Sequence, residues 1–199
     1  MIKLVKSIIK LLIIYMPGDF GIKIRKIYYS KKLKSLGKNV KIGIGVEIEG
    51  CEFIEIGDNV RIDKDCIIHA GISIINKKNI ILENSQNNIQ RGTIYIGDEV
   101  RINSRSSIYG YGGIKIDKFC VISESSKIFS STHIPFDIEK PDQKIYIMHS
   151  NNYINTPSIE SSISIGENSF LAVNSILFPG CSIGKDSFVM PNSILKDSF

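Results

Sequence analysis

Three histidines, His69, His133 and His149, are the side chains of this 199-residue sequence best suited to exchanging protons near neutral pH. A neutral imidazole can take the proton of a hydroxyl group while that group attacks an electrophile, so each histidine is a candidate general base. The histidines form no closely spaced pair in the sequence, which argues against a zinc site built from all three. We therefore expect no metal and keep zinc binding as a weaker alternative.

Cysteine chemistry is not indicated either. The four cysteines, Cys51, Cys66, Cys120 and Cys181, show no Cys-x-x-Cys spacing, so they suggest neither a zinc site nor a disulfide framework. This usage fits a reduced, cytoplasmic setting. The longest apolar runs fall short of the roughly 18 residues that a membrane span needs.

The positions of isoleucine reveal the elements that must hold these residues. The sequence contains 41 Ile against 9 Leu and 2 Ala, which favours β-structure over a helical bundle because isoleucine is β-branched. Aliphatic residues recur at every sixth position in several series. These series are Ile42, Ile48 and Ile54; Ile56, Ile62, Ile68, Ile74 and Ile80; Ile96, Ile102 and Ile108; Ile116, Ile122 and Ile128; and Ile165, Leu171, Leu177, Ile183, Val189 and Leu195.

A second position of each hexad, four residues later, holds a small or β-branched residue. It is occupied by Val60, Cys66, Val100, Ser106, Cys120, Ser126, Ser169, Ser175, Cys181, Ser187 and Ser193. A period of six fits neither an amphipathic helix nor a hairpin meander. It predicts a mainly β solenoid, wound into a triangular prism with one short strand and one corner per hexad. Three cysteines sit at the small position, so we interpret them as buried structural residues.

The repeat breaks in several places, and the breaks collect residues that the repeat does not need. About ten residues around Glu83–Gly92, and the insertion Tyr109–Gly113, are predicted to bulge from the prism. The longest interruption runs from about residue 130 to 162 and contains His133, Asp137 and His149. Loops of this length are usually functional or disordered. We expect this long extruded loop to carry the chemistry.

A basic segment of residues 1–38 precedes the repeat domain of residues 39–199. Through residue 41 the sequence has 11 lysines and arginines and a single acid, Asp19, whereas the remainder carries an excess of acids. The first residues follow a helical pattern with a basic stripe. Its members are Ile2, Val5, Ile9 and Leu12 with Lys3, Lys6 and Lys10.

Two uses of this short helical segment are open. Its apolar face can pack on the domain's own core, which is the commoner arrangement in soluble proteins. Alternatively, residues 1–16 can lie on an anionic membrane surface, which would place the protein on the inner face of the cell membrane. No nucleic-acid-binding motif accompanies the charge, so we expect no nucleic-acid partner.

Two stretches of the repeat carry a family resemblance. The run Ile165-Gly-Glu-Asn-Ser-Phe-Leu-Ala-Val-Asn-Ser-Ile-Leu-Phe-Pro-Gly-Cys-Ser-Ile-Gly is similar to the signature IGxNxWIGxxxxIxPGxxIG, and Ile114–Ile128 leads without a gap into Thr132-His133. With these motifs, residues 40–199 resemble the hexapeptide-repeat acyltransferases. They are most similar to sugar O-acetyltransferases, such as the galactoside and maltose enzymes and those that modify surface polysaccharides.

The resemblance implies a left-handed parallel β-helix, a homotrimer with active sites between subunits, and acetyl-CoA as co-substrate. It implies that His133 is the general base, with Glu124 or Asp137 as the carboxylate that orients its ring. It implies a donor site that includes Phe170, Ala172, Ser193 and Lys196. Two departures bear on that site, because Phe170 replaces the family's tryptophan and Met190-Pro191-Asn192 replaces small residues along the pantetheine arm.

Acceptor contacts are predicted next to the histidine coil. Arg101, Asn103 and Arg105 alternate with inward residues, and Tyr109 and Tyr111 lie in the neighbouring insertion. Forked donors and aromatic faces suit a sugar, although a solvated polar face would look similar. We expect structural or exposed roles for His69 and His149.

The sequence thus predicts an acetyl-CoA-dependent O-acetyltransferase that acts on a sugar hydroxyl of a bacterial surface polysaccharide or its precursor. N-acetylation of an amino sugar on a nucleotide carrier is the alternative enzyme reading. A catalytically inactive β-helix that only binds ligands is the alternative from another class.

Overall fold

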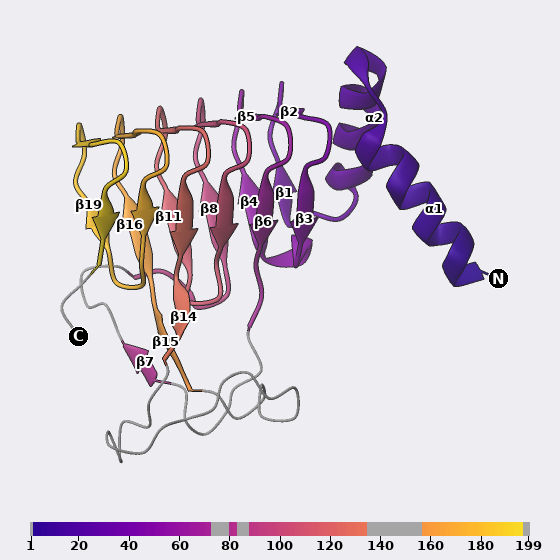
Figure 1. Cartoon of the computed structure of the whole chain (residues 1–199). Helices are drawn as coiled ribbons and strands as arrows, with labels where there is room; N and C mark the ends of the chain where they lie inside the picture. The colour runs from indigo at the N-terminus through magenta and orange to yellow at the C-terminus, as the bar shows by residue number, and fades with distance from the viewer. Residues whose placement is uncertain (1, 73–79, 83–87, 135–156, 197–199) are drawn as a thin grey trace.

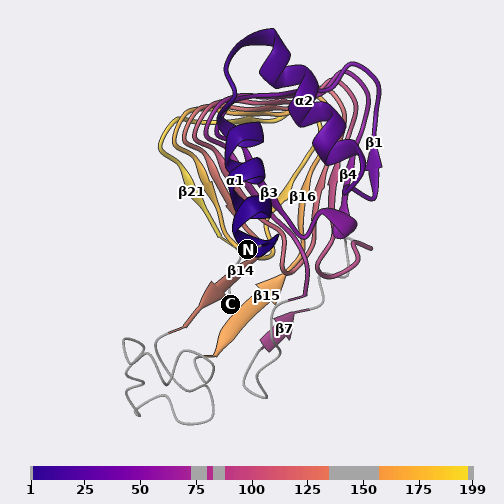
Figure 2. The ribbon, with the colours of Figure 1, turned by 90° about the vertical axis from the view of Figure 1, so that its right-hand side faces the viewer.

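The computed structural model describes residues 2–72, 80–82, 88–134 and 157–196. Two helices, α1 (Ile2–Tyr15) and α2 (Gly18–Ser30), precede a triangular prism of parallel strands. Figure 1 shows the coils stacked side by side with both helices at the N-terminal end, and Figure 2 shows the triangular outline along the prism axis. The predicted β-helix with a short helical segment and an extruded loop is confirmed.

Three six-stranded parallel sheets form the faces of the prism within the described residues. Sheet A contains β1 (Ser35–Leu36), β4 (Ile54–Ile56), β8 (Ile94–Ile96), β11 (Ile114–Ile116), β16 (Ile163–Ile165) and β19 (Ser182–Ile183). Sheet B contains β2 (Lys41–Ile42), β5 (Arg61–Ile62), β9 (Arg101–Ile102), β12 (Val121–Ile122), β17 (Phe170–Leu171) and β20 (Phe188–Val189). Sheet C contains β3 (Glu47–Glu49), β6 (Ile67–His69), β10 (Ser107–Tyr109), β13 (Lys127–Phe129), β18 (Ile176–Leu177) and β21 (Ile194–Leu195).

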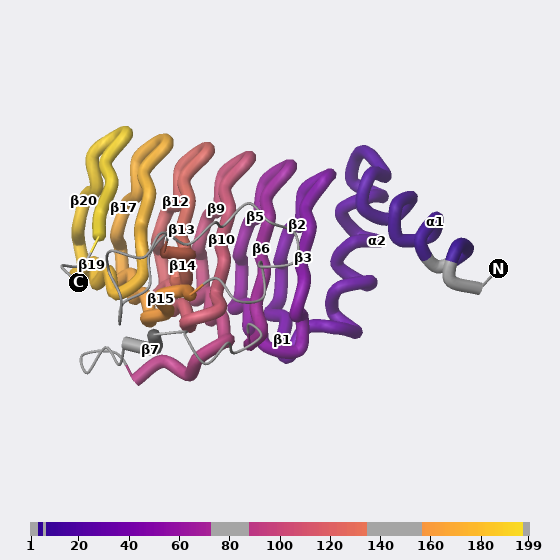
Figure 3. Tube along the Cα trace, turned by 60° about the horizontal axis from the view of Figure 1, so that its bottom comes forward, coloured from indigo at the N-terminus to yellow at the C-terminus, as the bar shows by residue number. Residues whose placement is uncertain are grey.

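The hexad residues fill the core as predicted. Ile102 pairs with Ile62 and Ile122 in the strands on either side, and all three side chains are almost wholly buried. Pairings of this kind repeat from coil to coil. Figure 3 shows the coils stacked on one another along the prism. Sheet A adds a second buried isoleucine at the start of its strands, for example Ile54 and Ile94. Stacking therefore buries a continuous aliphatic column that no single coil could bury alone.

The small hexad position has a hydrogen-bonding role. Ser126 Oγ donates to the carbonyl of Ala172 at 3.1 Å, and Cys120 Sγ donates to that of Gly166, also at 3.1 Å. In both cases the acceptor is a corner carbonyl of the next coil. Burial raises the pKa of the thiol of Cys120, and that of Cys66 to about 11, so both remain protonated donors at neutral pH. The structural interpretation of these cysteines is supported by this geometry.

The prism corners depend on residues in the left-handed backbone region. Eleven described residues other than glycine have positive φ, and seven of them are asparagine or aspartate at corner turns, such as Asn59 and Asn168. Short polar side chains tolerate this conformation better than bulky ones. The amides also stack between coils, for example Asn174 Nδ2 to Asn192 Oδ1 at 2.9 Å.

One series of predicted core positions is wrong at its last member, Ile80. Ile56, Ile62 and Ile68 follow the prism, but Ile80 lies in β7 (Ile80–Leu82), outside it, and Ile74 falls outside the described residues. The chain leaves the prism after β6 and re-enters at β8, so this excursion is longer than the ten residues expected around Glu83–Gly92. The spacing of six persists in the sequence although the strand pairs elsewhere. The Cys51–Phe53 3-10 turn explains the two-residue shift before Ile56.

A buried arginine attaches the helices to the first coil. The Arg25 side chain is 1% exposed, and it donates to the carbonyls of Met16 at 2.6 Å and Ile42 at 2.9 Å. It also reaches the last carbonyls of α1, where a cation is favoured by the helix dipole. Next to it, Gly21 is required because a Cβ atom would lie 2.0 Å from the Met16 oxygen. The first prism strand, β1, already begins at Ser35.

Replacing Arg25 with leucine should destabilise the N-terminal end of the prism. The substitution leaves several buried carbonyl groups without a donor, so we expect a loss of about 2–4 kcal/mol in unfolding free energy. Urea unfolding followed by circular dichroism measures it. Lys23→Leu, on the exposed side of the same helix, is the control and should change stability by about 0.5 kcal/mol or less. Equal effects of the two substitutions would refute the anchoring role.

Candidate functional site

All the interruptions of the prism leave from one corner. This loop corner, where sheet C passes to sheet A, carries the excursion between β6 and β8, the insertion Tyr109–Gly113, and the long loop between β13 and β16. A small sheet projects from it, made of β14 (Ser131–His133), β15 (Ser158–Ser161) and β7. Figure 2 shows these strands extending from one vertex of the triangle. The predicted loop of residues 130–162 thus begins and ends in paired strands.

The base of the long loop fixes the position of His133. Strands β14 and β15 pair antiparallel, with His133 opposite Ser158, and the side chain of His133 is exposed at the end of β14. The amide of Ser161 donates to the carbonyl of Ser130 at 3.0 Å, which closes the loop against the prism. His133 therefore lies just outside the fourth coil, at the mouth of the loop, as the sequence predicts. Asp137 and His149 fall outside the described residues.

A buried ion pair holds this loop base and was not predicted. Arg91, at the end of the excursion, contacts Glu160 of β15 through Nε and Nη2, each 2.6 Å from the Oε2 atom. The Glu160 side chain is wholly buried. Since Glu160 lies opposite Ser131 of β14, the pair connects the excursion to the strand that carries His133. Arg91 and Glu160 are 69 residues apart and belong to no repeat, so the sequence carries no pattern that predicts their contact.

The insertion Tyr109–Gly113 packs against the same base. The amide of Gly112 donates to Ser130 Oγ at 2.9 Å, and that hydroxyl donates to the carbonyl of Tyr109 at 2.9 Å. A Cβ atom on Gly112 would lie 2.3 Å from the carbonyl oxygen of Ser130, so only glycine fits. Tyr109 and Tyr111, both predicted as acceptor contacts, are therefore brought to the corner that carries His133.

An aromatic ladder runs along sheet C beside this corner. It consists of the residues that directly follow the inward aliphatic residue in successive strands: His69, Tyr109, Phe129 and Phe178. Neighbouring ring centroids are 5.0, 5.4 and 6.3 Å apart, and Tyr111 lies 6.4 Å from Tyr109. Phe129 and Phe178 were not selected as site residues from the sequence. Their shared position, directly after the inward aliphatic residue of a hexad, could have identified them. Lys196 occupies the same position after β21.

Other predicted acceptor residues lie on a different part of the prism. Arg101 is exposed on sheet B, and Asn103 and Arg105 belong to the turn between β9 and β10. Arg105 forms an exposed ion pair with Glu124, which lies at the corresponding turn one coil later. Glu124 precedes strand β13 and His133 follows it, so the two residues lie at opposite ends of this strand. The structure therefore pairs two predicted site residues with each other at the corner between sheets B and C.

Predicted donor residues gather on the last two coils. Phe170 on the outer face of sheet B is 38% exposed, and its ring stacks on Phe188 with centroids 5.4 Å apart. Ala172 is buried at the corner between sheets B and C, and Ser193 lies at the same corner one coil later. The side chain of Met190, which replaces a small residue in the family pattern, is exposed there. Lys196 is exposed, on the side of the loop corner.

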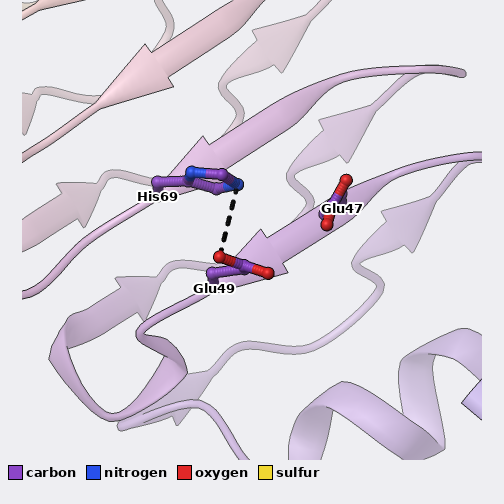
Figure 4. A group of neighbouring side chains, drawn as sticks. All are labelled: Glu47, Glu49 and His69. Carbon is purple, nitrogen blue, oxygen red and sulfur yellow. Dashed lines mark ion pairs between the residues drawn. The ribbon is translucent and has the colours of Figure 1, made fainter. Parts of the chain in front are cut away.

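Side chains of His69, Glu49 and Glu47 form a cluster on sheet C (Figure 4). His69 Nε2 is 3.9 Å from a carboxylate oxygen of Glu49, and Tyr109 packs against its ring. Nε2 itself is buried and makes no hydrogen bond to the described residues. The Glu49 side chain is 53% exposed, and exposed acidic groups commonly cluster without an ion. We assign this cluster no metal, and His69 a mainly structural place in the aromatic ladder.

Substitution of Arg91 by methionine should loosen the loop base. The change removes the guanidinium of Arg91 from the buried carboxylate of Glu160, and the loss of one partner costs about 3–5 kcal/mol in such pairs. We expect lower stability in urea unfolding and faster hydrogen exchange at the amides of β14 and β15. The matched control is Arg61→Met, which breaks an exposed pair with Asp63 and should cost about 1 kcal/mol or less. Unchanged exchange in β14 would contradict the role of the pair.

Known proteins resemble the chain in sequence and in fold. A curated protein of Escherichia coli, dTDP-4-amino-4,6-dideoxy-D-glucose acyltransferase, is 30% identical over 154 residues, which are 73% of this chain. The match covers 63% of that protein, so the chain spans less than two thirds of its length. No family model matches the chain.

Solved structures match over most of the chain. A variant of AntD, an N-acyltransferase from Bacillus cereus in complex with dTDP and coenzyme A, has a TM-score of 0.64 at 23% identity, over 88% of this chain and 80% of that one. The hexapeptide-repeat-containing acetyltransferase VCA0836 of Vibrio cholerae has a TM-score of 0.51 at 17% identity, over 94% and 75% of the two chains. The chain therefore has the left-handed parallel β-helix fold of the hexapeptide-repeat acyltransferases.

Proposed function

We propose that the chain is a coenzyme A-dependent acyltransferase whose acceptor is an amino sugar on a nucleotide carrier. The observation that carries this proposal is the 30% identity to an acyltransferase of dTDP-4-amino-4,6-dideoxy-D-glucose. It is supported by the fold shared with AntD, one variant of which is described in complex with the same dTDP-sugar and coenzyme A. The O-acetylation of a polysaccharide hydroxyl, our main prediction from sequence, gains no support from these relatives.

The reaction requires a base at the acceptor. An amine attacks a thioester carbonyl only when its nitrogen lone pair is free, and the nitrogen must lose a proton as the amide forms. In our proposal His133 takes that proton, and the departing thiolate of coenzyme A receives one as the tetrahedral intermediate collapses. Backbone N–H groups at the prism corner would stabilise the oxyanion. No covalent intermediate is required, which agrees with the burial of all four cysteines and with the raised pKa of the Cys66 thiol.

The loop corner supplies the surfaces that a nucleotide-linked sugar needs. Tyr109 and Tyr111, whose ring centroids are 6.4 Å apart, belong to the insertion that is hydrogen-bonded to Ser130, the residue before the strand that carries His133. Aromatic faces stack on bases and on the apolar faces of sugars. Asp137 remains a predicted orienting residue for His133. Glu124, bound to Arg105 at another corner, is the weaker candidate within one chain.

The separation of the predicted residues supports a site shared between subunits. His133 lies at the loop corner, whereas Phe170 lies on sheet B and Ser193 at the corner between sheets B and C. A triangular prism holds these places apart within one chain. We therefore propose a homotrimer, in which the loop corner of one chain faces the donor residues of its neighbour.

A paired set of acceptors tests the chemistry. With acetyl-CoA, we expect acetylation of a dTDP-4-amino-4,6-dideoxyhexose and none of the matched sugar with a hydroxyl at carbon 4, measured by mass spectrometry and thiol release. His133→Ala should lower kcat about 100-fold or more, since a general base contributes at least that much. His69→Ala is the matched control and should retain most of the activity. Exclusive acetylation of the hydroxyl sugar would restore the O-acetylation reading.

If the protein binds these ligands but acetylates neither acceptor, the alternative of a catalytically inactive β-helix that only binds ligands would be supported instead.

Complementation tests the shared site. His133→Ala and Phe170→Asp should each be inactive alone, the second because a carboxylate replaces an apolar face for the pantetheine arm. When the two variants are co-expressed and assembled together, mixed trimers should regain a substantial part of the activity, because some interfaces combine two intact halves. Trimers built from His133→Ala alone, expressed and assembled in the same way, are the control. No recovery in trimers shown to be mixed would place the whole site within one chain.

A further inference from the structure

The helix α1 turns its broad apolar face away from the protein. Five apolar residues of this 14-residue helix have exposed fractions of 49–65%: Leu4, Val5, Ile8, Ile9 and Leu12. Residues of this kind on a surface helix normally face the core. An uncovered apolar face of this size marks an interaction site.

The opposite face of α1 is the one that meets the prism. Ser7, Lys10 and Ile14, successive residues along one side of the helix, line a recess together with Gly45 and Glu47 of the first coil. Ile14 is buried, and its carbonyl accepts a hydrogen bond from the amide of Gly45 at 3.0 Å. The alternative in which the apolar stripe packs on the chain's own core is therefore not what the described residues show.

The charge around this face is almost entirely positive. The N-terminal 41 residues carry 11 lysines and arginines and one acid, Asp19. Lys31 and Lys32, just past the end of α2, are exposed and line a groove together with Ile13 of α1. Lys23 of α2 is also exposed, whereas the only arginine of the two helices, Arg25, is buried. Figure 1 shows α1 projecting from the end of the prism, with nothing of the described chain beyond it. Within those residues, none of the helices is long and apolar enough to cross a bilayer.

We propose that α1 binds flat to an anionic lipid surface. The exposed apolar side chains would enter the boundary between headgroups and acyl chains, and the surrounding lysines would lie at the level of the anionic headgroups. The prism would then stand on the membrane by its N-terminal end. This arrangement leaves the loop corner and the donor coils, which lie further along the prism axis, in contact with water.

Flotation of the full chain with lipid vesicles tests the proposal. We expect binding to vesicles of phosphatidylcholine that contain about one quarter phosphatidylglycerol, and much weaker binding to phosphatidylcholine alone. The double variant Ile8→Gln/Leu12→Gln should bind about tenfold or more weakly, because both side chains lie on the outer face. Lys31→Gln should lower binding about fivefold at low salt, and high salt should weaken binding by the wild-type chain.

The matched control is Ile194→Gln, which replaces a side chain of similar exposure, 61%, at the other end of the prism. It should bind like the wild-type chain. Circular dichroism of the double variant checks that the helix and the prism persist. The proposal is overturned if the wild-type chain fails to float or if the double variant binds equally well. It is also overturned if the double variant changes only the number of subunits in sedimentation, since α1 would then pair with a second copy.

Discussion

The structure depends on the in-register stacking of its coils, in which every prism strand pairs with the same hexad position one coil away. This constraint applies to the corners as much as to the faces. Corner residues adopt positive φ and most of them are asparagine or aspartate, while the small residue beside them must fit against the next coil. In several coils that small residue is a serine or a cysteine whose side chain also donates to a carbonyl of the next coil. Ser126 and Cys120 perform this task with different atoms but the same geometry. Any residue that satisfies both demands can be exchanged, so the repeat tolerates much sequence variation.

An insertion is compatible with this register only if the chain leaves the coil and returns to it at the same position along the prism axis. Here all of them use the corner between sheets C and A. Their bases interlock through Gly112 and Ser130, through the amide of Ser161, and through the Arg91–Glu160 pair. A rigid solenoid thereby positions one exposed histidine with precision although it lies at the edge of a long loop. The buried ion pair is costly to desolvate, and it fixes the strand next to it in one place.

Much of the fold was predictable because the hexad records burial directly. Ile102 and Ile122 are buried because their spacing matches one side of the triangle, and the same logic located the base of the long loop. The spacing failed at Ile80 because a β-branched residue suits any strand, and spacing does not encode which strand it pairs with. The Arg91–Glu160 contact escaped prediction since it joins two interruptions, where no period operates. In α1 the pattern predicted an amphipathic helix, but periodicity defines a face and not its partner.

The same geometry determines how far apart the residues of the proposed site lie. A prism whose sides are short strands presents three faces and three corners, and a ligand as long as coenzyme A spans more than one of them. His133 on the loop corner can act on a thioester only if the donor's reactive end reaches that corner. In the proposed site, Phe170 and Ser193 would hold the donor on sheet B and at the next corner, and the donor would have to reach His133 across a surface that these residues of one chain do not complete. The separation that a regular prism imposes on its faces is the reason why we propose an active site formed where two prisms meet.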